Sequence, residues 1–390
     1  MPTRLAALIA LLLALAGLPA SAQDFETGAR AVWVHDMTTD TVLLAQNADT
    51  PLPPASMSKL MTVFLAFEAI ADGRLSVDEE LAVSQHAASY TGSSMFLRAG
   101  ERVRVDDLLR GVIVLSGNDA ATVLAEALSP DGTEAGFARL MTERGRQIGL
   151  TASTFANANG WPDPAQRMSV HDLGVLAERI ITDFPTFYPL FAEEEFAFDN
   201  RVPANSQNRN PILSLGLGAD GLKTGHTSEA GYGLVGSAMQ GDRRIVFVLT
   251  GLASESARQD EATRILNWAF RQFTLRDLGR AGDVLGQADV WMGAAPQVGL
   301  ALPDDLRILM PAIAPGAVDA EISYAGPVAA PVTAGAELAR LHVVRDGLPP
   351  VDLPLVAATD VPAGGFLVRT GAALRVILSR ILPQGAAAGA

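Results

Sequence analysis

Residues 54–62 read Pro54-Ala55-Ser56-Met57-Ser58-Lys59-Leu60-Met61-Thr62. The hydroxyl of Ser56 and the amine of Lys59 are three positions apart, and a helix would bring both onto one face. A serine hydroxyl is a weak nucleophile until a neighbouring base takes its proton, and a desolvated lysine can be that base. Because Ser-x-x-Lys is also common on helix surfaces, this motif alone indicates a nucleophile only weakly.

The use of lysine along the chain strengthens this interpretation. The sequence contains 29 lysines and arginines in total, of which only Lys59 and Lys223 are lysines. Arginine cannot lose its proton in a protein, whereas burial can tune a lysine to do so. The two lysines therefore mark the places where a titratable amine is needed.

Lys223 lies in a second motif, which reads Gly221-Leu222-Lys223-Thr224-Gly225-His226-Thr227. We expect this motif just before a strand, where Thr224 supplies a hydroxyl. Gly225 would let the backbone of a ligand approach a strand edge closely. The plainer alternative is a polar loop that enters the strand.

A third motif, Ser116-Gly117-Asn118, follows the apolar residues 112–115. We expect this turn to present Ser116 to a cleft. The alternative is that Ser116 or Asn118 only caps a helix that begins near Asp119, and capping is compatible with catalysis.

The order Ser-x-x-Lys, Ser-x-Asn, Lys-Thr-Gly is far more specific than any one motif, and it is a known signature of serine β-lactamases and penicillin-binding proteins. With these motifs the sequence resembles the low-molecular-mass penicillin-binding D-alanyl-D-alanine carboxypeptidases, the peptidase S11 family. Three further segments carry the likeness: residues 92–97 (GSSMFL), 230–233 (AGYG) and, weakly, 329–338. The resemblance covers nearly the whole mature chain.

The resemblance implies a role for each motif. Ser56 would attack the penultimate D-alanine carbonyl of a peptidoglycan stem peptide, or a β-lactam antibiotic, with Lys59 as the base. Ser116 would pass protons and Asn118 would hold the peptide.

The Lys-Thr-Gly motif would bind the terminal carboxylate through Lys223 and Thr224, with Gly225 and His226 beside it. The oxyanion would lie between the backbone N–H groups of Ser56 and His226. Arg258 would also reach the carboxylate, or it is simply a surface arginine at the start of a helix; the two alternatives are about equal.

The pattern of apolar residues predicts an α+β domain followed by a small all-β domain. Two short strands at 31–35 and 41–44 form a hairpin, and helices are expected from about 56 and at 105–115, 119–128, 134–148, 169–182 and 257–273. Strands are expected at 232–238 and 244–249. The resemblance identifies residues 23–277 as a penicillin-binding, β-lactamase-like serine acyl-transferase domain and residues 278–361 as a β-sandwich accessory domain.

Composition and both ends of the chain bear on location and partners. A net charge of −14 argues against nucleic-acid binding. Residues 1–22 have the charge, apolar run and small-residue cleavage site of a secretory signal peptide. No cysteine is present and no two histidines have metal-ligand spacing, so we expect neither a metal nor a cofactor.

The tail, residues 362–390, has the pattern of a basic amphipathic helix at 366–382. We expect it to lie on the outer leaflet of the cytoplasmic membrane and to hold an exported, periplasmic enzyme there. The alternative is a helix that packs on the β domain.

Three other functions remain open. A D,D-endopeptidase or a β-lactamase could use the same domain, although the Glu-x-x-Leu-Asn deacylation motif of class A β-lactamases is missing. A catalytically silent wall-binding protein would have no reason to keep its only lysines in these motifs.

The Asn157–Asp163 segment resembles the family's Asn-Gly segment, and we assign it a structural role.

Overall fold

The computed structural model describes residues 25–313, 318–366 and 370, and they divide into two compact units. The first unit spans residues 25–271, and the second begins at Gln272. The predicted signal peptide, and residues 367–369 and 371–390 of the predicted tail, lie outside the described residues. Among the residues that the structure describes, no helix combines the length and the apolar content that crossing a bilayer requires.

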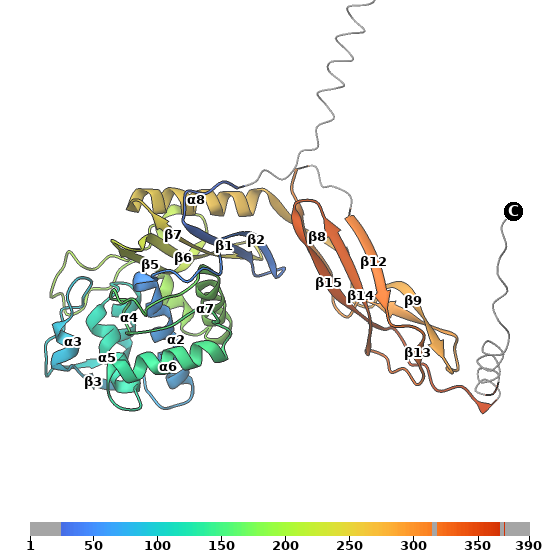
Figure 1. Cartoon of the computed structure of the whole chain (residues 1–390), viewed down its shortest axis with the longest axis horizontal. Coiled ribbons are helices and arrows are strands. Elements are labelled where there is room, and N and C mark those ends of the chain that lie inside the picture. The colour runs from blue at the N-terminus through green and yellow to red at the C-terminus, as the bar shows by residue number, and fades with distance from the viewer. Residues whose placement is uncertain (1–24, 314–317, 367–369, 371–390) are drawn as a thin grey trace, which may run out of the picture. The chain divides into compact units, whose positions relative to one another are not determined.

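An antiparallel five-stranded sheet, in the order β2-β1-β7-β6-β5, organises the first unit (Figure 1). Its strands are β1 (Ala31–Asp36), β2 (Thr41–Gln46), β5 (Ala219–Thr227), β6 (Gly231–Gln240) and β7 (Arg243–Leu252). A small second ladder joins β3 (Glu80–Ala82) to β4 (Arg102–Arg104). The predicted hairpin at the start of the chain is confirmed as β1 and β2, and the predicted strands at 232–238 and 244–249 as β6 and β7.

Helices cover both faces of this sheet. The helical elements are η1 (Ala55–Ser58), α2 (Lys59–Ala71), α3 (Gln85–Ser89), α4 (Val105–Ile113), α5 (Asn118–Leu128), α6 (Glu134–Gln147), α7 (Val170–Asp183), η2 (Tyr188–Ala192), η3 (Leu213–Leu215) and α8 (Glu255–Arg271). In β1, Ala31 and Trp33 join the core that contains α2, whereas Val32 and Val34 join the core under α8. A strand buried on both faces needs a continuous apolar run, which is what residues 31–34 supply.

Helix α2 lies inside the helical layer and is apolar nearly all round. Leu60, Val63, Phe64 and Phe67, the positions predicted to repeat at helical spacing, are all buried. The Phe67 ring stacks on Phe187 with centroids 4.8 Å apart. Packing on all sides fixes the position of the first residue of this helix, Lys59.

The prediction for residues 221–227 needs a correction, because they form most of strand β5 and not a loop before a strand. Lys223 pairs with Val235 and Thr224 with Leu234 of β6. Two glycines and several polar residues weaken the intrinsic strand preference of this segment, so its pairing with the apolar β6 decides the structure.

The second unit is all-β, as predicted. A six-stranded sheet in the order β12-β14-β15-β10-β9-β13 and a two-stranded sheet of β8 and β11 share one apolar core, which includes Leu300, Ile308 and Leu355. The strands are β8 (Phe273–Gly279), β9 (Val284–Trp291), β10 (Gln297–Ala301), β11 (Leu306–Pro311), β12 (Val318–Tyr324), β13 (Val328–Ala329), β14 (Glu337–Arg345) and β15 (Leu348–Ala357).

The domain boundary expected at 277/278 falls within β8. That strand pairs with β11 and so lies in the second unit.

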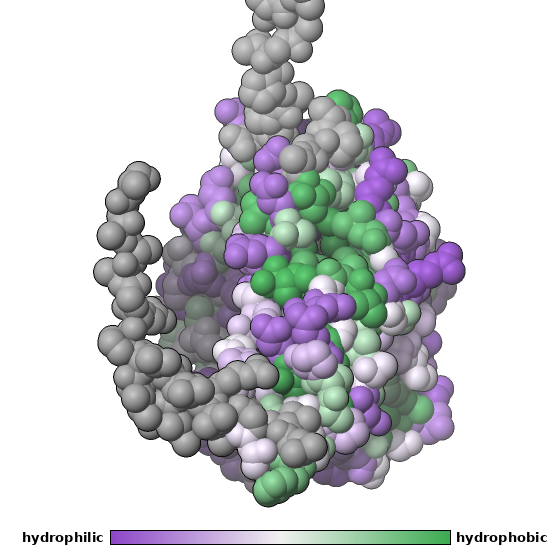
Figure 2. Space-filling model, turned by 90° about the vertical axis from the view of Figure 1, so that its right-hand side faces the viewer, coloured by the Kyte–Doolittle hydropathy of each residue, from purple (hydrophilic) through white to green (hydrophobic). Residues whose placement is uncertain are grey.

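Figure 2 shows apolar residues gathered between polar ones on one face of the molecule. Large apolar side chains of this unit that remain exposed include Leu278, Val284, Leu285, Ile313 and Val344. All residues of the site described next lie in the first unit.

Candidate active site

The predicted nucleophile and base meet at the junction of η1 and α2. Ser56 lies in the 3-10 turn, Lys59 is the first residue of α2, and the Lys59 Nζ to Ser56 Oγ distance is 2.9 Å. The expectation that the two side chains share one face is confirmed. Gly160 lies against this turn with a φ of 78°, and a Cβ there would be 2.0 Å from the Ala55 carbonyl oxygen. The close approach therefore requires glycine.

The Lys59 amine is fully buried and lies within hydrogen-bond distance of three oxygen atoms. Besides Ser56 these are Asn118 Oδ1 at 2.7 Å and the backbone carbonyl of Asn159 at 2.5 Å. Burial, assisted by the positive charge of Arg209, lowers the pKa of Lys59 to about 7, against the opposing effect of Asp119 and Glu134. A large fraction of this amine is therefore neutral near pH 7, as a base requires.

The Ser116-Gly117-Asn118 motif forms the turn that starts α5. Gly117 is the N-cap residue and no side chain caps the helix, so the capping alternative is wrong for both Ser116 and Asn118. Ser116 is buried and has a φ of 60°. Non-glycine residues in this strained region concentrate at functional sites. Asn118 bridges Lys59 and the backbone carbonyl of Thr91 through its amide.

The loop at residues 92–97 is attached to α5 mainly through Asp119. The Asp119 carboxylate accepts from Ser94 Oγ at 2.6 Å and from the backbone N–H groups of Met95 and Leu97 at 3.0 and 3.1 Å. This buried carboxylate therefore fixes the wall of the cleft beside Asn118.

Lys223 and Thr224 lie on β5, the edge strand of the sheet, and both are buried. The pKa of Lys223 is well below its usual value because the amine is buried and because Lys59, Arg209 and Arg258 add positive charge around it. Positive charge gathered in this way is a favourable place for an anionic substrate group, which would also restore the charge of Lys223.

Gly225, which is predicted to let a ligand approach the strand edge, also has a packing role. A Cβ at this position would be 2.9 Å from the Pro54 carbonyl oxygen and 3.0 Å from Met57 Cγ. The glycine therefore lets β5 pack against the nucleophile turn, which places the strand of Lys223 beside the turn of Ser56. The exposed His226 ring follows on the same strand and stacks on Tyr232 with centroids 3.9 Å apart.

A cavity of about 360 Å³ brings the motifs together. It is lined by Ser56, Gly92, Ser93, Asn118, Asn159, Gly160, Trp161, Pro162, His226, Thr227 and Ser228. Ser56, Asn118 and His226 were predicted to form the site, and they open onto this cavity. Lys59 is buried next to Ser56, and Lys223, Thr224 and Ser116 are buried in the elements that form its walls.

Arg258 is buried, so the alternative of a surface arginine is wrong. It forms an ion pair with Glu255 at 2.8 Å, and its guanidinium lies 5.8 Å from the centroid of the Tyr232 ring. Its Nε is buried without a hydrogen-bond partner among the described residues. The Nε–H group therefore remains available as a hydrogen-bond donor to an anionic ligand.

Arg209 is a site residue that the sequence did not identify. Its exposed guanidinium donates to Ser93, and its charge lowers the pKa of both lysines. It lies in a polar segment, Asn208-Arg209-Asn210-Pro211, outside every motif in the sequence. No local pattern marks it, because only the fold brings it to the cleft.

Comparisons with known proteins agree with this geometry. A family model described as peptidase S11, D-alanyl-D-alanine carboxypeptidase, matches residues 19–253, and one described as the C-terminal domain of penicillin-binding protein 5 matches residues 273–363. The D-alanyl-D-alanine carboxypeptidase DacD of Escherichia coli is 32% identical over 360 residues, covering 90% of this chain and 92% of the relative. DacC of the same species is 33% identical over 349 residues, covering 87% of this chain and 86% of the relative.

Solved structures of penicillin-binding proteins are also similar to this chain. Penicillin-binding protein 5 from Haemophilus influenzae superposes with a TM-score of 0.76 at 30% identity, covering 87% of this chain and 99% of that protein. Penicillin-binding protein D2 from Listeria monocytogenes, solved with ampicillin bound, has a TM-score of 0.54 at 29% identity and covers 63% of this chain and 99% of that protein.

Proposed function

This chain belongs to the peptidase S11 family of serine-type D-alanyl-D-alanine carboxypeptidases, and we propose that it works through an acyl ester on Ser56. The observation that carries this proposal is the 2.9 Å contact between Ser56 Oγ and the buried Lys59 amine, whose pKa is about 7. Ser56 Oγ attacks the carbonyl of the penultimate D-alanine of a stem pentapeptide. Lys59 Nζ takes the hydroxyl proton as the new C–O bond forms.

The tetrahedral intermediate then collapses and the peptide C–N bond breaks. The departing D-alanine nitrogen receives the proton through Lys59 and Ser116, and water later hydrolyses the ester with the same base. Backbone N–H groups of Ser56 and His226 stabilise the oxyanion, and each such donor is worth about 3–4 kcal/mol. Asn118 holds the peptide beside the nucleophile.

The terminal carboxylate of the substrate binds among the cations beside β5. Lys223, Arg209 and Arg258 supply the positive charge, and Thr224 supplies a hydroxyl. Support for this placement comes from the depressed pKa of Lys223, which an anion would raise again.

β-Lactam antibiotics are expected to acylate the same serine. The related Listeria protein has been solved with ampicillin and with cefotaxime bound. In this chain the β-lactam carbonyl would take the place of the D-alanine carbonyl, and the β-lactam carboxylate would lie near Lys223.

Product analysis tests the carboxypeptidase against the endopeptidase. We expect the full chain to remove one D-alanine from a stem pentapeptide and to leave a cross-linked dimer of stem peptides largely intact, as followed by mass spectrometry. Cleavage of the dimer to monomers at a comparable rate would instead support the D,D-endopeptidase.

The sequence of the two ends supports a proposal for location. Residues 1–22 have the pattern of a secretory signal peptide, so the enzyme would act outside the cytoplasmic membrane. Residues 366–382 would lie on the outer leaflet as an amphipathic helix, where each arginine near an anionic surface adds about 1 kcal/mol. Attachment of this kind is reversible and weakened by salt.

A truncation after Phe366 tests this attachment. It keeps Ala363 and Gly364, which bond the backbone of Gly293 and Met292 in the second unit. We expect the truncated enzyme in the soluble fraction with its pentapeptide activity unchanged. Ile377→Asp, on the predicted apolar face, should also move the active enzyme to the soluble fraction. The control Ser379→Asp, on the opposite face, should still sediment with membranes. If the truncated protein also sediments, the anchor lies elsewhere.

A further inference from the structure

A neutral lysine amine must be oriented before it can act as a base. It has two N–H donors and one lone pair, and only the lone pair can take the proton of Ser56. Asn118 Oδ1 and the Asn159 carbonyl accept from Lys59 Nζ at 2.7 and 2.5 Å. These two acceptors engage both N–H groups, so the lone pair is left facing Ser56 Oγ. The position of the Asn159 carbonyl therefore helps to decide whether the base is aimed correctly.

The loop that contains Asn159 is held by a buried carboxylate, Glu134, at the start of α6. Glu134 Oε1 accepts from the backbone N–H of Ala158 at 3.0 Å and from Asn159 Nδ2 at 3.3 Å. The neighbouring carbonyl, that of Ala158, accepts from Thr62 Oγ1 on α2 at 2.6 Å. Glu134 thus contacts both residues that connect this loop to the helix of the base.

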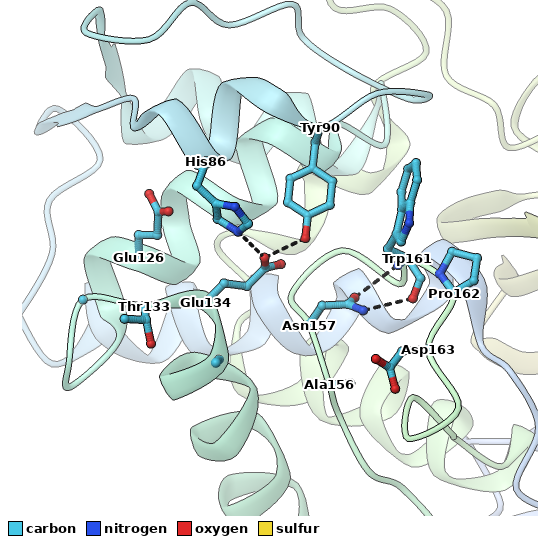
Figure 3. A pocket seen from close by; sticks show the side chains of 12 residues that line it. His86, Tyr90, Glu126, Thr133, Glu134, Ala156, Asn157, Trp161, Pro162 and Asp163 are labelled. Atoms are coloured by element: carbon cyan, nitrogen blue, oxygen red, sulfur yellow. Dashed lines mark hydrogen bonds and ion pairs between the residues drawn. The ribbon is translucent and has the colours of Figure 1, made fainter.

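The second oxygen of Glu134 is fixed from the other side. Glu134 Oε2 accepts from Tyr90 Oη at 2.7 Å and lies 2.8 Å from His86 Nε2, as Figure 3 shows. Burial, together with the hydrogen bond to Glu134, raises the pKa of Tyr90 above its usual value, so the phenol remains a donor. With partners on both oxygens, the carboxylate cannot rotate away from the loop.

We propose that Glu134 is the positioning residue of the base: it holds the Asn159 carbonyl on Lys59 Nζ and so aims the amine at Ser56. This inference rests on the proposed role of Lys59. Glu134 does not line the cavity onto which Ser56 opens, so it acts through the Asn159 loop and through its charge.

The charge of Glu134 gives this role a signature that a purely structural residue would lack. Burial and the positive charge of Arg209 lower the pKa of Lys59, while Asp119 and Glu134 raise it; Lys223 is a further cation nearby. Removing the negative charge of Glu134 therefore lowers the pKa of Lys59 further. An amide at this position keeps an oxygen for Ala158 and Asn159 but loses the charge.

The test is the pH dependence of acylation of the full chain by a fluorescent penicillin. For the natural sequence we expect the acylation rate to rise with pH through about 7, because the neutral form of Lys59 is the base. In Glu134→Gln this rise should move to lower pH, with the rate at high pH within a few-fold of the natural enzyme. In Glu134→Ala, which also releases the loop, the high-pH rate should fall by about 10²-fold.

Glu126→Gln is the matched control. Glu126 lines the same pocket wall as Glu134, but its carboxylate accepts from Ser84 Oγ and not from the Asn159 loop. The acylation rate of Glu126→Gln should rise over the same pH range as that of the natural enzyme. If Glu134→Gln has the same profile as the natural enzyme, the proposal is overturned even if Glu134→Ala fails to fold. If the natural chain is not acylated at all, it is the proposed function that fails.

Discussion

Replacing Ser56 by alanine is expected to abolish labelling by a fluorescent penicillin and to lower D-alanine release by about 10⁶-fold, the loss typical of removing a serine nucleophile. The side chain is partly exposed in the cavity and its hydroxyl contacts Lys59, so its removal takes away the attacking atom and little packing. The measurements are gel fluorescence after incubation with the penicillin and D-alanine release from a pentapeptide.

The same motif offers a matched control in Ser58. Its hydroxyl is fully buried and donates to the Ala55 carbonyl at 3.0 Å, away from Lys59. Ser58→Ala should lose about 1 kcal/mol of stability with the hydrogen bond and retain labelling. Labelling that persists in Ser56→Ala would show that another residue carries the acyl group, and the mechanism would be wrong.

The sequence predicted the catalytic centre well because its main contact is local. Ser56 and Lys59 are one helical turn apart, so their meeting depends only on a turn that continues into a helix. The apolar positions of α2, from Leu60 to Phe67, predicted that helix and its burial correctly. The α+β class and the all-β second unit also follow from patterns of neighbouring residues, and both are confirmed.

The parts that the sequence could not predict depend on contacts between distant segments. Strand β5 has a glycine-rich sequence typical of a loop, and it is a strand because β6 pairs with it. Arg209 and Glu134 lie in ordinary polar segments, and only the fold brings them to the two lysines and to the Asn159 loop. The packing of Gly225 against the nucleophile turn was not predicted for the same reason, since nothing in the neighbouring sequence shows that contact.

The second prediction with a large expected effect compares substitutions of the two lysines, Lys59 and Lys223. Lys59→Arg keeps the positive charge but should lower the rate of acylation by about 10⁴-fold, because a guanidinium cannot take the Ser56 proton near neutral pH. Lys223→Arg should be milder, about tenfold, because that position mainly needs positive charge for the substrate carboxylate. Acylation rates with a penicillin and kcat/KM for a pentapeptide measure both variants.

A fold control is needed because Lys59 is fully buried and arginine is larger. Lys59→Met has nearly the same length but leaves the Asn118 Oδ1 and Asn159 carbonyl acceptors unpaired, so it should unfold at a somewhat lower temperature than the natural protein, remain folded at 25 °C and lack acylation. Loss of activity in a folded Lys59→Met then reports the missing base and not a damaged core. If Lys59→Arg and Lys223→Arg lose activity equally while both remain folded, the proton acceptor and the carboxylate-binding cation have been assigned wrongly. The low pKa of Lys223 would then identify it as a second candidate for the base.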